Sequence, residues 1–223
     1  TGTQQNALDR FSGSAGNWIV YRTNGWVTVN QFKANGQFIE VDGFQMAGTG
    51  MTAFQGAFDA NNHNLIARNL TITNLFTNYY GILINSAHTN LYVDGCRFKD
   101  CNYPYVSLEG GNHTITNCVW TGSSGWDAIR LLCSSSLVAD NIVTNFTGSV
   151  DTYAVEHGDF IQSFSDNGEV ATNNIIERNF INNLHYLQIG NFTDIATNNS
   201  VSDWTWRNNI FIGPSMQANI YTP

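Results

Sequence analysis

The sequence has little charge of either sign and almost no lysine. Only 12% of its 223 residues are charged, and nine Lys plus Arg stand against seventeen Asp plus Glu, for a formal net charge of −8. A nucleic-acid-binding surface needs a basic patch for the phosphates, so we do not expect nucleic acid as a partner. Acidic, lysine-poor surfaces are usual in extracellular proteins and are compatible with bound Ca²⁺. We therefore expect an extracellular, secreted protein.

Long apolar runs and cysteine motifs are also lacking. No run approaches the roughly 18 apolar residues of a membrane span. No signal peptide is visible, and the sequence starts at Thr1 rather than at Met. The chain reads as a mature or cropped product, or as a segment of something longer. Its four cysteines match no zinc or redox spacing and imply no disulfide framework in a chain of this length. The length suits one domain over residues 1–223.

Proline is scarce, with three residues, whereas asparagine is very common and often paired. Asn favours turns, and the β-branched and aromatic stretches between the Asn residues are typical of strands. One segment recurs: an apolar strand, a polar residue, an Asn or Gly, and an apolar residue. Its Asn or Gly falls at positions 43, 69, 95, 117, 141, 179 and 209. The first four intervals are nearly constant and the last two are longer, which predicts insertions near residues 148–158 and 190–202.

A second kind of strand recurs between these segments. It occupies residues 80–84, 104–108, 127–131, 159–163 and 185–189, with a weaker copy near 217–221. Two strand families that alternate with a period of about 25 residues predict a solenoid in which each coil is one repeat. We therefore predict an all-β chain that forms a single-stranded parallel β-helix of about seven coils. Buried Asn residues at its turns are expected to form a side-chain amide ladder between coils.

Three features resemble a known superfamily. They are the strand pattern Ile-x-x-Asn-x-Ile, the strand Asp-x-Ile-Gln at 159–162, and the opening segment 12–21. Together they resemble the right-handed parallel β-helix (pectin-lyase-like) superfamily. That resemblance implies a right-handed β-helix and a carbohydrate-active protein, since the superfamily includes polysaccharide lyases, glycoside hydrolases, epimerases, phage tailspikes and adhesins. It does not choose among these functions.

One face of the predicted helix carries the candidate site. If Ile129 and Ile161 point inward, their strand neighbours point outward. Coils stack only about 4.8 Å apart, so residues distant in sequence share one surface. The insertion at 148–158 lies beside this surface, and long loops on a rigid scaffold commonly carry function. The residues expected to line the surface are Asp127, Arg130, Asp159, Gln162, His185 and Gln188.

The chemistry expected there is cleavage or epimerisation of a polysaccharide. Glycoside hydrolysis commonly needs two carboxylates about 5–9 Å apart, whereas lyases and epimerases need a base and cations that neutralise a uronate. The candidate catalytic residues are Asp127, Arg130, Asp159, His157 and His185. The candidate substrate-binding residues are Tyr103, Trp126, Tyr153, Glu156, Gln162, Tyr186 and Gln188. Neither lysine, Lys33 or Lys99, falls on this surface, which argues against a lysine base.

Structural roles compete with these functional ones. Asp127 and Asp159 could cap turns by accepting backbone N–H groups, and His63, His88 and His113 lie near turns. Charges at positions 42, 68 and 94, and at 140 and 178, alternate in sign and predict an outer ion-pair ladder of low individual strength. Cys96 and Cys118 are expected to be stacked core thiols. Five Asn-x-Thr/Ser sequons occur, at positions 69, 112, 145, 191 and 198. In a solenoid rich in Asn and Thr such matches arise by chance, and Asn69 is expected to be buried.

Two further expectations remain open. Ca²⁺ could bind around Asp166, Asn167 and Glu169, or near Asp151, although the spacing matches no EF-hand. No metal site is firmly expected. The alternative to an enzyme, which the resemblance also implies, is a non-catalytic, receptor-binding or structural β-helix module of a phage tailspike or adhesin. Such a module could form a homotrimer, and in a tailspike it would lie on the virion surface. Such a solenoid would need its open strand edges covered.

Overall fold

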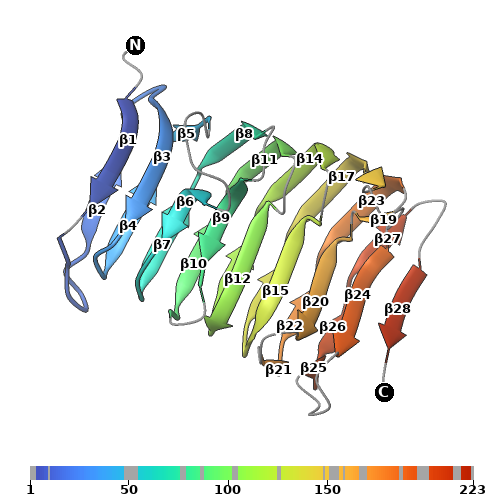
Figure 1. The fold of residues 1–223 in the computed structure, drawn as a ribbon. Coiled ribbons are helices and arrows are strands. Elements are labelled where there is room, and N and C mark those ends of the chain that lie inside the picture. The colour runs from blue at the N-terminus through green and yellow to red at the C-terminus, as the bar shows by residue number, and fades with distance from the viewer. Residues whose placement is uncertain are drawn as a thin grey trace.

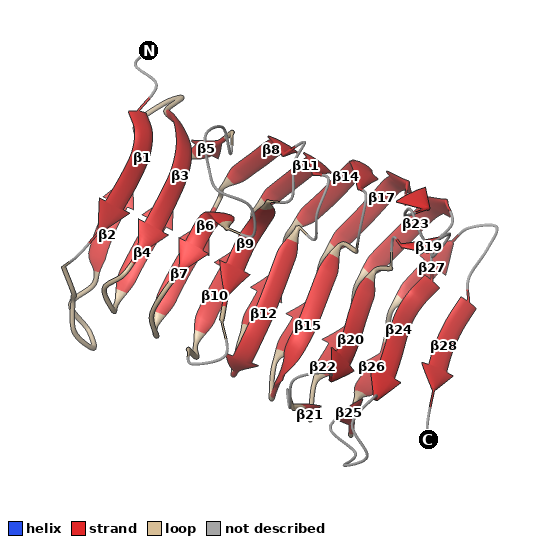
Figure 2. Cartoon of the chain, viewed as in Figure 1, coloured by secondary structure: helices blue, strands red, loops and turns tan. Residues whose placement is uncertain are grey.

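The computed structural model describes the backbone of residues 4–9, 11–47, 55–75, 79–85, 88–101, 105–124, 127–147, 149–150, 156–157, 159–165, 170–185, 188–194, 201–212 and 217–221. These residues form strands, turns and bends and no helix (Figure 2). Within the same ranges, no helix is long and apolar enough to cross a membrane. The strands stack in parallel from one end of the molecule to the other, with the two termini at opposite ends (Figure 1). The predicted parallel β-solenoid is confirmed.

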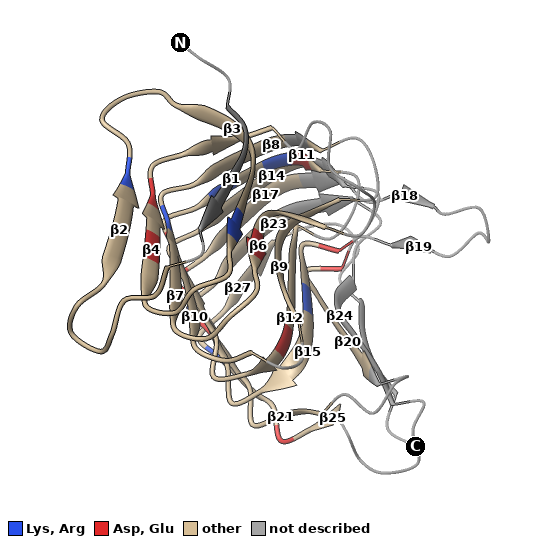
Figure 3. Ribbon diagram, turned by 60° about the vertical axis from the view of Figure 1, so that its left-hand side comes forward, with Lys and Arg blue, Asp and Glu red and all other residues tan. Residues whose placement is uncertain are grey.

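Each coil contributes a strand to three successive faces, which surround the interior in Figure 3. The first face is an eight-stranded sheet, so the coil count differs slightly from the seven predicted. Its strands are β2 (Ile19–Arg22), β4 (Ile39–Asp42), β7 (Leu65–Arg68), β10 (Leu91–Asp94), β13 (Thr114–Thr116), β16 (Leu137–Ala139), β22 (Ile175–Glu177) and β26 (Thr205–Arg207).

The other two faces meet at one long strand, β3 (Thr28–Ala34), which pairs at one end with β5 and at the other with β6. β1 (Gln4–Asp9) also pairs with β3. The second face holds β5 (Gln45–Met46), β8 (Thr71–Leu75), β11 (Arg97–Cys101), β14 (Val119–Ser124), β17 (Ile142–Thr147), β23 (Phe180–His185) and β27 (Ile210–Ile212). The third face holds β6 (Gly56–Ala60), β9 (Tyr80–Ile84), β12 (Val106–Gly111), β15 (Ile129–Ser134), β20 (Ile161–Ser165), β24 (Gln188–Asp194) and β28 (Gln217–Tyr221).

The sequence predicted two of these three faces. The strands of the second face follow the first so closely, after a turn of only two residues in several coils, that both had been assigned to one segment. The insertion predicted at 148–158 is confirmed as a departure from the coil, because β18 (Ser149–Val150) and β19 (Glu156–His157) pair antiparallel there. The insertion predicted at 190–202 is wrong over 190–194, which belongs to β24. A small sheet of β21 (Ala171–Thr172) and β25 (Val201–Ser202) lies farther along.

Two columns of left-handed residues flank the first face and explain the abundance of Asn. Asn and Gly adopt positive φ at lower cost than other residues. The column before the strands is Phe38, Asn64, Asn90, Asn112, Ser135, Asn173 and Asp203, all with φ between 55° and 61°. The column after them is Gly43, Asn69, Gly95, Asn117, Asp140, Arg178 and Asn208. The chain turns a corner at each of these positions.

The second of these columns shows that the alignment of the internal repeats is wrong by one residue in the last three coils, where the left-handed residues are 140, 178 and 208. β13 pairs with β16 so that Thr116 lies beside Ala139, which places Asn117 beside Asp140. Asn141 therefore belongs to the next, inward-facing column, together with Cys118. The sequence alone confused the two columns because Asn occupies a turn in one coil and the interior in the next.

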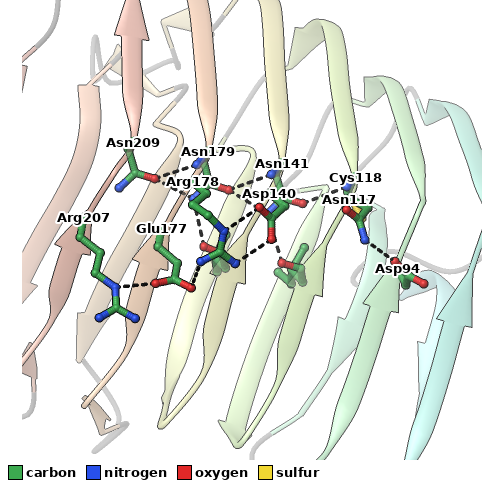
Figure 4. A network of polar contacts seen from close by, with 12 residues as sticks. Asp94, Asn117, Cys118, Asp140, Asn141, Glu177, Arg178, Asn179, Arg207 and Asn209 are labelled. Atoms are coloured by element: carbon green, nitrogen blue, oxygen red, sulfur yellow. Dashed lines mark hydrogen bonds and ion pairs between the residues drawn. The ribbon is translucent and has the colours of Figure 1, made fainter.

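The inward-facing Asn residues form the predicted amide ladder, which Figure 4 shows. The side-chain amide of Asn141 donates to Asn179 Oδ1 at 2.9 Å, and that of Asn179 donates to Asn209 Oδ1 at 2.9 Å. The same oxygens accept the backbone N–H groups of Asn141 and Asn179, while Cys118 N–H donates to Asn141 Oδ1. A buried polar group is stable when it is hydrogen-bonded. The side-chain oxygen of each of these residues accepts a backbone N–H group from the preceding coil.

A second polar ladder begins where the first-face strands shorten from four residues to three. In the longer strands the N–H of Leu65 donates to a backbone carbonyl, that of Asn90. From β10 onward side chains supply the acceptor instead. Leu91 N–H donates to His113 Nδ1 at 3.1 Å, His113 N–H to Ser136 Oγ at 3.0 Å, and Ser136 N–H to Asn174 Oδ1 at 2.9 Å.

His113 has both ring nitrogens engaged. Nδ1 accepts the Leu91 N–H, and Nε2–H donates to the Glu109 carbonyl at 2.7 Å. The ring is buried in its neutral form, and burial lowers the pKa of His113 to about 4. The structural role predicted for this histidine is confirmed. His63 is likewise engaged, since its Nδ1 accepts the Thr89 N–H at 3.0 Å.

The remaining core is apolar and contains all four cysteines as free, buried thiols. Phe98 and Trp120 stack on neighbouring coils with ring centroids 5.0 Å apart. Cys96 and Cys118 occupy one inward column, as predicted, and burial raises the pKa of the Cys96 thiol. The prediction that these two thiols lie together in the core is confirmed.

The outer ion pairs are also present. Arg22 donates to Asp42 at 2.6 Å, and Arg68 lies 3.7 Å from Asp94. Arg178 makes a two-pronged contact with Asp140, with both N–O distances 2.8 Å (Figure 4). The last pair lies in the turn column, so it is not part of the strand column that the sequence predicted.

Candidate functional site on the third face

The predicted neighbours on the third face do lie side by side. β15 pairs with β20 so that Ile129 is beside Ile161 and Arg130 beside Gln162. The two Ile side chains are buried in the core, and Arg130 and Gln162 belong to the alternate, outward set. The same register continues through the pairs on the preceding strands. The outward column is Lys33, Asp59, Leu83, Ser107, Arg130 and Gln162.

Arg130 is the centre of the candidate site. Its Nη2 donates to Gln162 Oε1 at 3.4 Å and lies 3.8 Å from Asp127 Oδ2. The guanidinium carbon is 5.2 Å from the centroid of the Phe164 ring, within cation–π range. Although the side chain belongs to the outward set, Arg130 is only 8% exposed. A buried guanidinium is costly unless it is paired, and here a carboxylate, an amide and an aromatic ring surround it.

Asp127 makes the turn-capping contact to a backbone N–H group that the sequence suggested for it. Its carboxylate is fully buried, and Oδ1 accepts the backbone N–H of Asp159 at 3.3 Å, on the next coil. Asp159, two residues before β20, is 3% exposed. The turn-capping role is therefore shown for Asp127. For Asp159 it stays a prediction.

His185 and Gln188 do not occupy the predicted positions. His185 is the last residue of β23 on the second face, where it pairs with Thr147. On the third face Ile161 pairs with Gly190, so Asn191 and not Gln188 is the neighbour of Gln162. The segment His-Tyr-Leu-Gln-Ile imitates the alternation of a third-face strand, but it spans the end of one strand and the beginning of the next.

The other predicted site residues are not placed by the structure. The backbone of Glu156 and His157 forms β19, and His157 is two residues before Asp159 in the sequence. The side chains of both residues lie outside the described part of the chain. Four predicted stacking residues lie outside the described residues entirely: Tyr103, Trp126, Tyr153 and Tyr186. So do the residues predicted to hold Ca²⁺, which are Asp151, Asp166, Asn167 and Glu169. Among the side chains that are described, no three His, Cys, Asp or Glu residues gather as a metal site would require.

The outward column begins with an acid–lysine pair that was not predicted from the sequence. Lys33 pairs in register with Asp59, and Lys33 Nζ lies 4.0 Å from Asp59 Oδ2. Burial raises the pKa of Asp59. Lys33 thus lies on the same face as Arg130, but four strand spacings of about 4.8 Å separate the two, so Lys33 is not among the residues around Arg130. The shared pattern Phe-Lys-Ala and Phe-Asp-Ala, at 32–34 and 58–60, was the available signal.

The sequence matches no protein-family model and no curated protein. The solenoid assignment therefore rests on the strand pairings themselves.

Proposed function

We propose that this chain is an extracellular parallel β-helix protein, of the pectin-lyase-like type, that binds a polysaccharide on its third face and acts on it there. The observation that carries the proposal is the buried pair Arg130 and Gln162 on the outward side of a sheet, with the buried Asp127 and Asp159 just before the two strands. Outward positions on a solenoid are ordinarily solvated. Charges held there at the cost of desolvation are a frequent mark of a functional site.

The contacts favour lyase or epimerase chemistry over a two-carboxylate hydrolase. A hydrolase needs both carboxylates for the reaction, whereas Asp127 already accepts a backbone N–H and contacts Arg130. In our proposal Asp159 removes the proton next to a uronate carboxylate, and Arg130 neutralises the charge that develops on that group. Asp127 and Phe164 then hold the guanidinium in position.

The test is incubation with a panel of anionic and neutral polysaccharides. Absorbance in the unsaturated-uronate band indicates a lyase, a changed uronate composition without chain cleavage indicates an epimerase, and new reducing ends without that absorbance indicate a hydrolase. Asp159→Asn should abolish the reaction, whereas Asp140→Asn, in the outer ion pairs, should not. Full activity of folded Asp159→Asn would remove Asp159 from the mechanism.

A second candidate function, a non-catalytic module of an oligomeric tailspike or adhesin, is favoured by one observation. On the second face, Val119, Ile142, Phe180 and Ile210 lie in one register column on successive strands. Ile142 is 42% exposed and Ile210 56% exposed. An exposed apolar row of this kind suits contact between subunits. Light scattering of wild type and Ile142→Asp distinguishes a trimer held by this row from a monomer.

A further inference from the structure

The five Asn-x-Thr/Ser sequons differ in whether the asparagine side chain is described and in what it contacts. A sequon can carry an N-linked oligosaccharide only where the asparagine amide reaches solvent and the attached sugar has room. The side chains of Asn69, Asn112 and Asn145 are described, and all three are exposed. The earlier expectation that Asn69 is buried is therefore wrong. Asn191 and Asn198 have no described side chain.

Asn112 offers an uncommitted amide. It lies at the corner between β12 and β13, with a left-handed φ of 57°. Its backbone N–H donates to the Ser134 carbonyl at 2.9 Å, but its side-chain amide makes no hydrogen bond with any residue in the described part of the chain. The sequon hydroxyl belongs to Thr114, the first residue of β13, which is partly exposed. His113 between them is buried and fully hydrogen-bonded, so the backbone of the sequon is held while the Asn112 amide is directed away from the core.

The other two described sequons are less open. Asn69 uses its Nδ2 to donate to Asp42 Oδ1 at 2.9 Å, and Asp42 is in turn bound by Arg22. A sugar on Asn69 Nδ2 would crowd that ion pair. Asn145 already takes part in an interaction, and its Thr147 has no described side chain. The exposed Asn112 amide, which makes no hydrogen bond with any of the described residues, is therefore the best placed of the three to carry a sugar.

We propose that Asn112 is an N-glycosylation site. The inference rests on the extracellular location proposed above, and it is independent of any activity on polysaccharides. In the modification, Asn112 Nδ2 forms a bond to the anomeric carbon of an oligosaccharide supplied on a lipid pyrophosphate. The pyrophosphate leaves with its lipid, and the amide nitrogen loses one proton. The sugar would stand at the corner of the third and first faces, outside the apolar core.

The test is secretion of the full chain from a eukaryotic host, followed by intact mass measurement before and after treatment with a peptide N-glycosidase. Wild type should carry a glycan that the glycosidase removes, and peptide mapping should place it on Asn112. Asn112→Asp should lack it while keeping the left-handed turn, because Asp also tolerates positive φ.

A matched pair of variants separates the sequon from the fold. Thr114→Ser keeps a sequon hydroxyl and should retain the glycan, whereas Thr114→Ala should lose it. Secreted wild type without a glycan overturns the proposal. So does a glycan that persists in Asn112→Asp, or one that maps to Asn69 or Asn145 with Asn112 unmodified. Because the readout is mass, these outcomes leave the polysaccharide assays to be judged separately.

Discussion

Replacing His113 with Asn should remove a pH-dependent weakness from the fold. His113 accepts one backbone N–H and donates to one carbonyl. Asn174, two coils farther along the same ladder, fills the acceptor role with its amide, because Oδ1 accepts Ser136 N–H at 2.9 Å. An Asn at 113 can therefore accept the Leu91 N–H without carrying a titratable ring, although it gives up the ring's bond to the Glu109 carbonyl.

The size of the effect follows from the pKa of His113. In the unfolded chain the ring has its ordinary pKa of 6.5, and burial lowers the pKa to about 4 in the folded chain. Between these values the unfolded state binds a proton that the folded state does not, so stability falls as the pH falls from 6.5 to 4. The full loss is about 3 kcal/mol, at 1.36 kcal/mol for each pH unit. Above pH 6.5 the contribution is constant.

Urea denaturation of wild type and His113→Asn at several pH values between 7.5 and 4 provides the assay. At pH 7.5 the variant should be less stable than wild type by about 1 kcal/mol, because it loses the ring's bond to the Glu109 carbonyl. As the pH falls, the difference should shift in favour of the variant, since carboxylates such as Asp59 contribute equally to both. Parallel pH profiles for the two proteins would refute the assignment of a neutral, buried His113.

Three further predictions concern buried groups. Asn179→Ala should lower the free energy of unfolding by about 2–4 kcal/mol, because it leaves Asn141 N–H and the Val138 carbonyl without their partner; a loss under 1 kcal/mol in urea denaturation would contradict the amide ladder. Ser163→Ala should leave stability unchanged or raise it by up to about 1 kcal/mol, because Ser163 Oγ is buried and has no hydrogen bond within the described residues; marked destabilisation on thermal denaturation would show that the hydroxyl has a partner. All four thiols should resist a thiol reagent in the folded protein and react on unfolding, because burial shields them; rapid labelling of the native chain would argue against the core placement.

Sequence periodicity predicted the solenoid because the same turn recurs in every coil. Positions 43, 69, 95 and 117 are Gly or Asn, and the structure places all four in the left-handed column. Beyond position 117 the column continues with Asp140, which breaks the Asn/Gly pattern, and with Arg178, a residue type that seldom adopts positive φ. The inward Asn residues next to them supplied a false continuation of the pattern. Composition could not distinguish an Asn that turns the chain from an Asn that is buried in it.

The candidate site was predicted in part for the same reason. Arg130 and Gln162 were placed correctly because each follows a buried Ile on a regular strand. His185 was misplaced because two faces meet near it, and strand alternation looks the same on either face.

By itself, the sequence determined the repeat, which consists of short apolar strands with Asn and Gly at the corners. Because only 12% of the residues are charged, it also determined a largely uncharged surface with a few ion pairs. Only the tertiary structure decided which residues of neighbouring coils lie against one another. In that register Asp127 accepts the Asp159 N–H, Arg130 lies over the Phe164 ring, and His113 accepts the Leu91 N–H. The physical reason is that each of these contacts joins residues more than twenty positions apart, so the stacking of coils selects the contact and local preference does not.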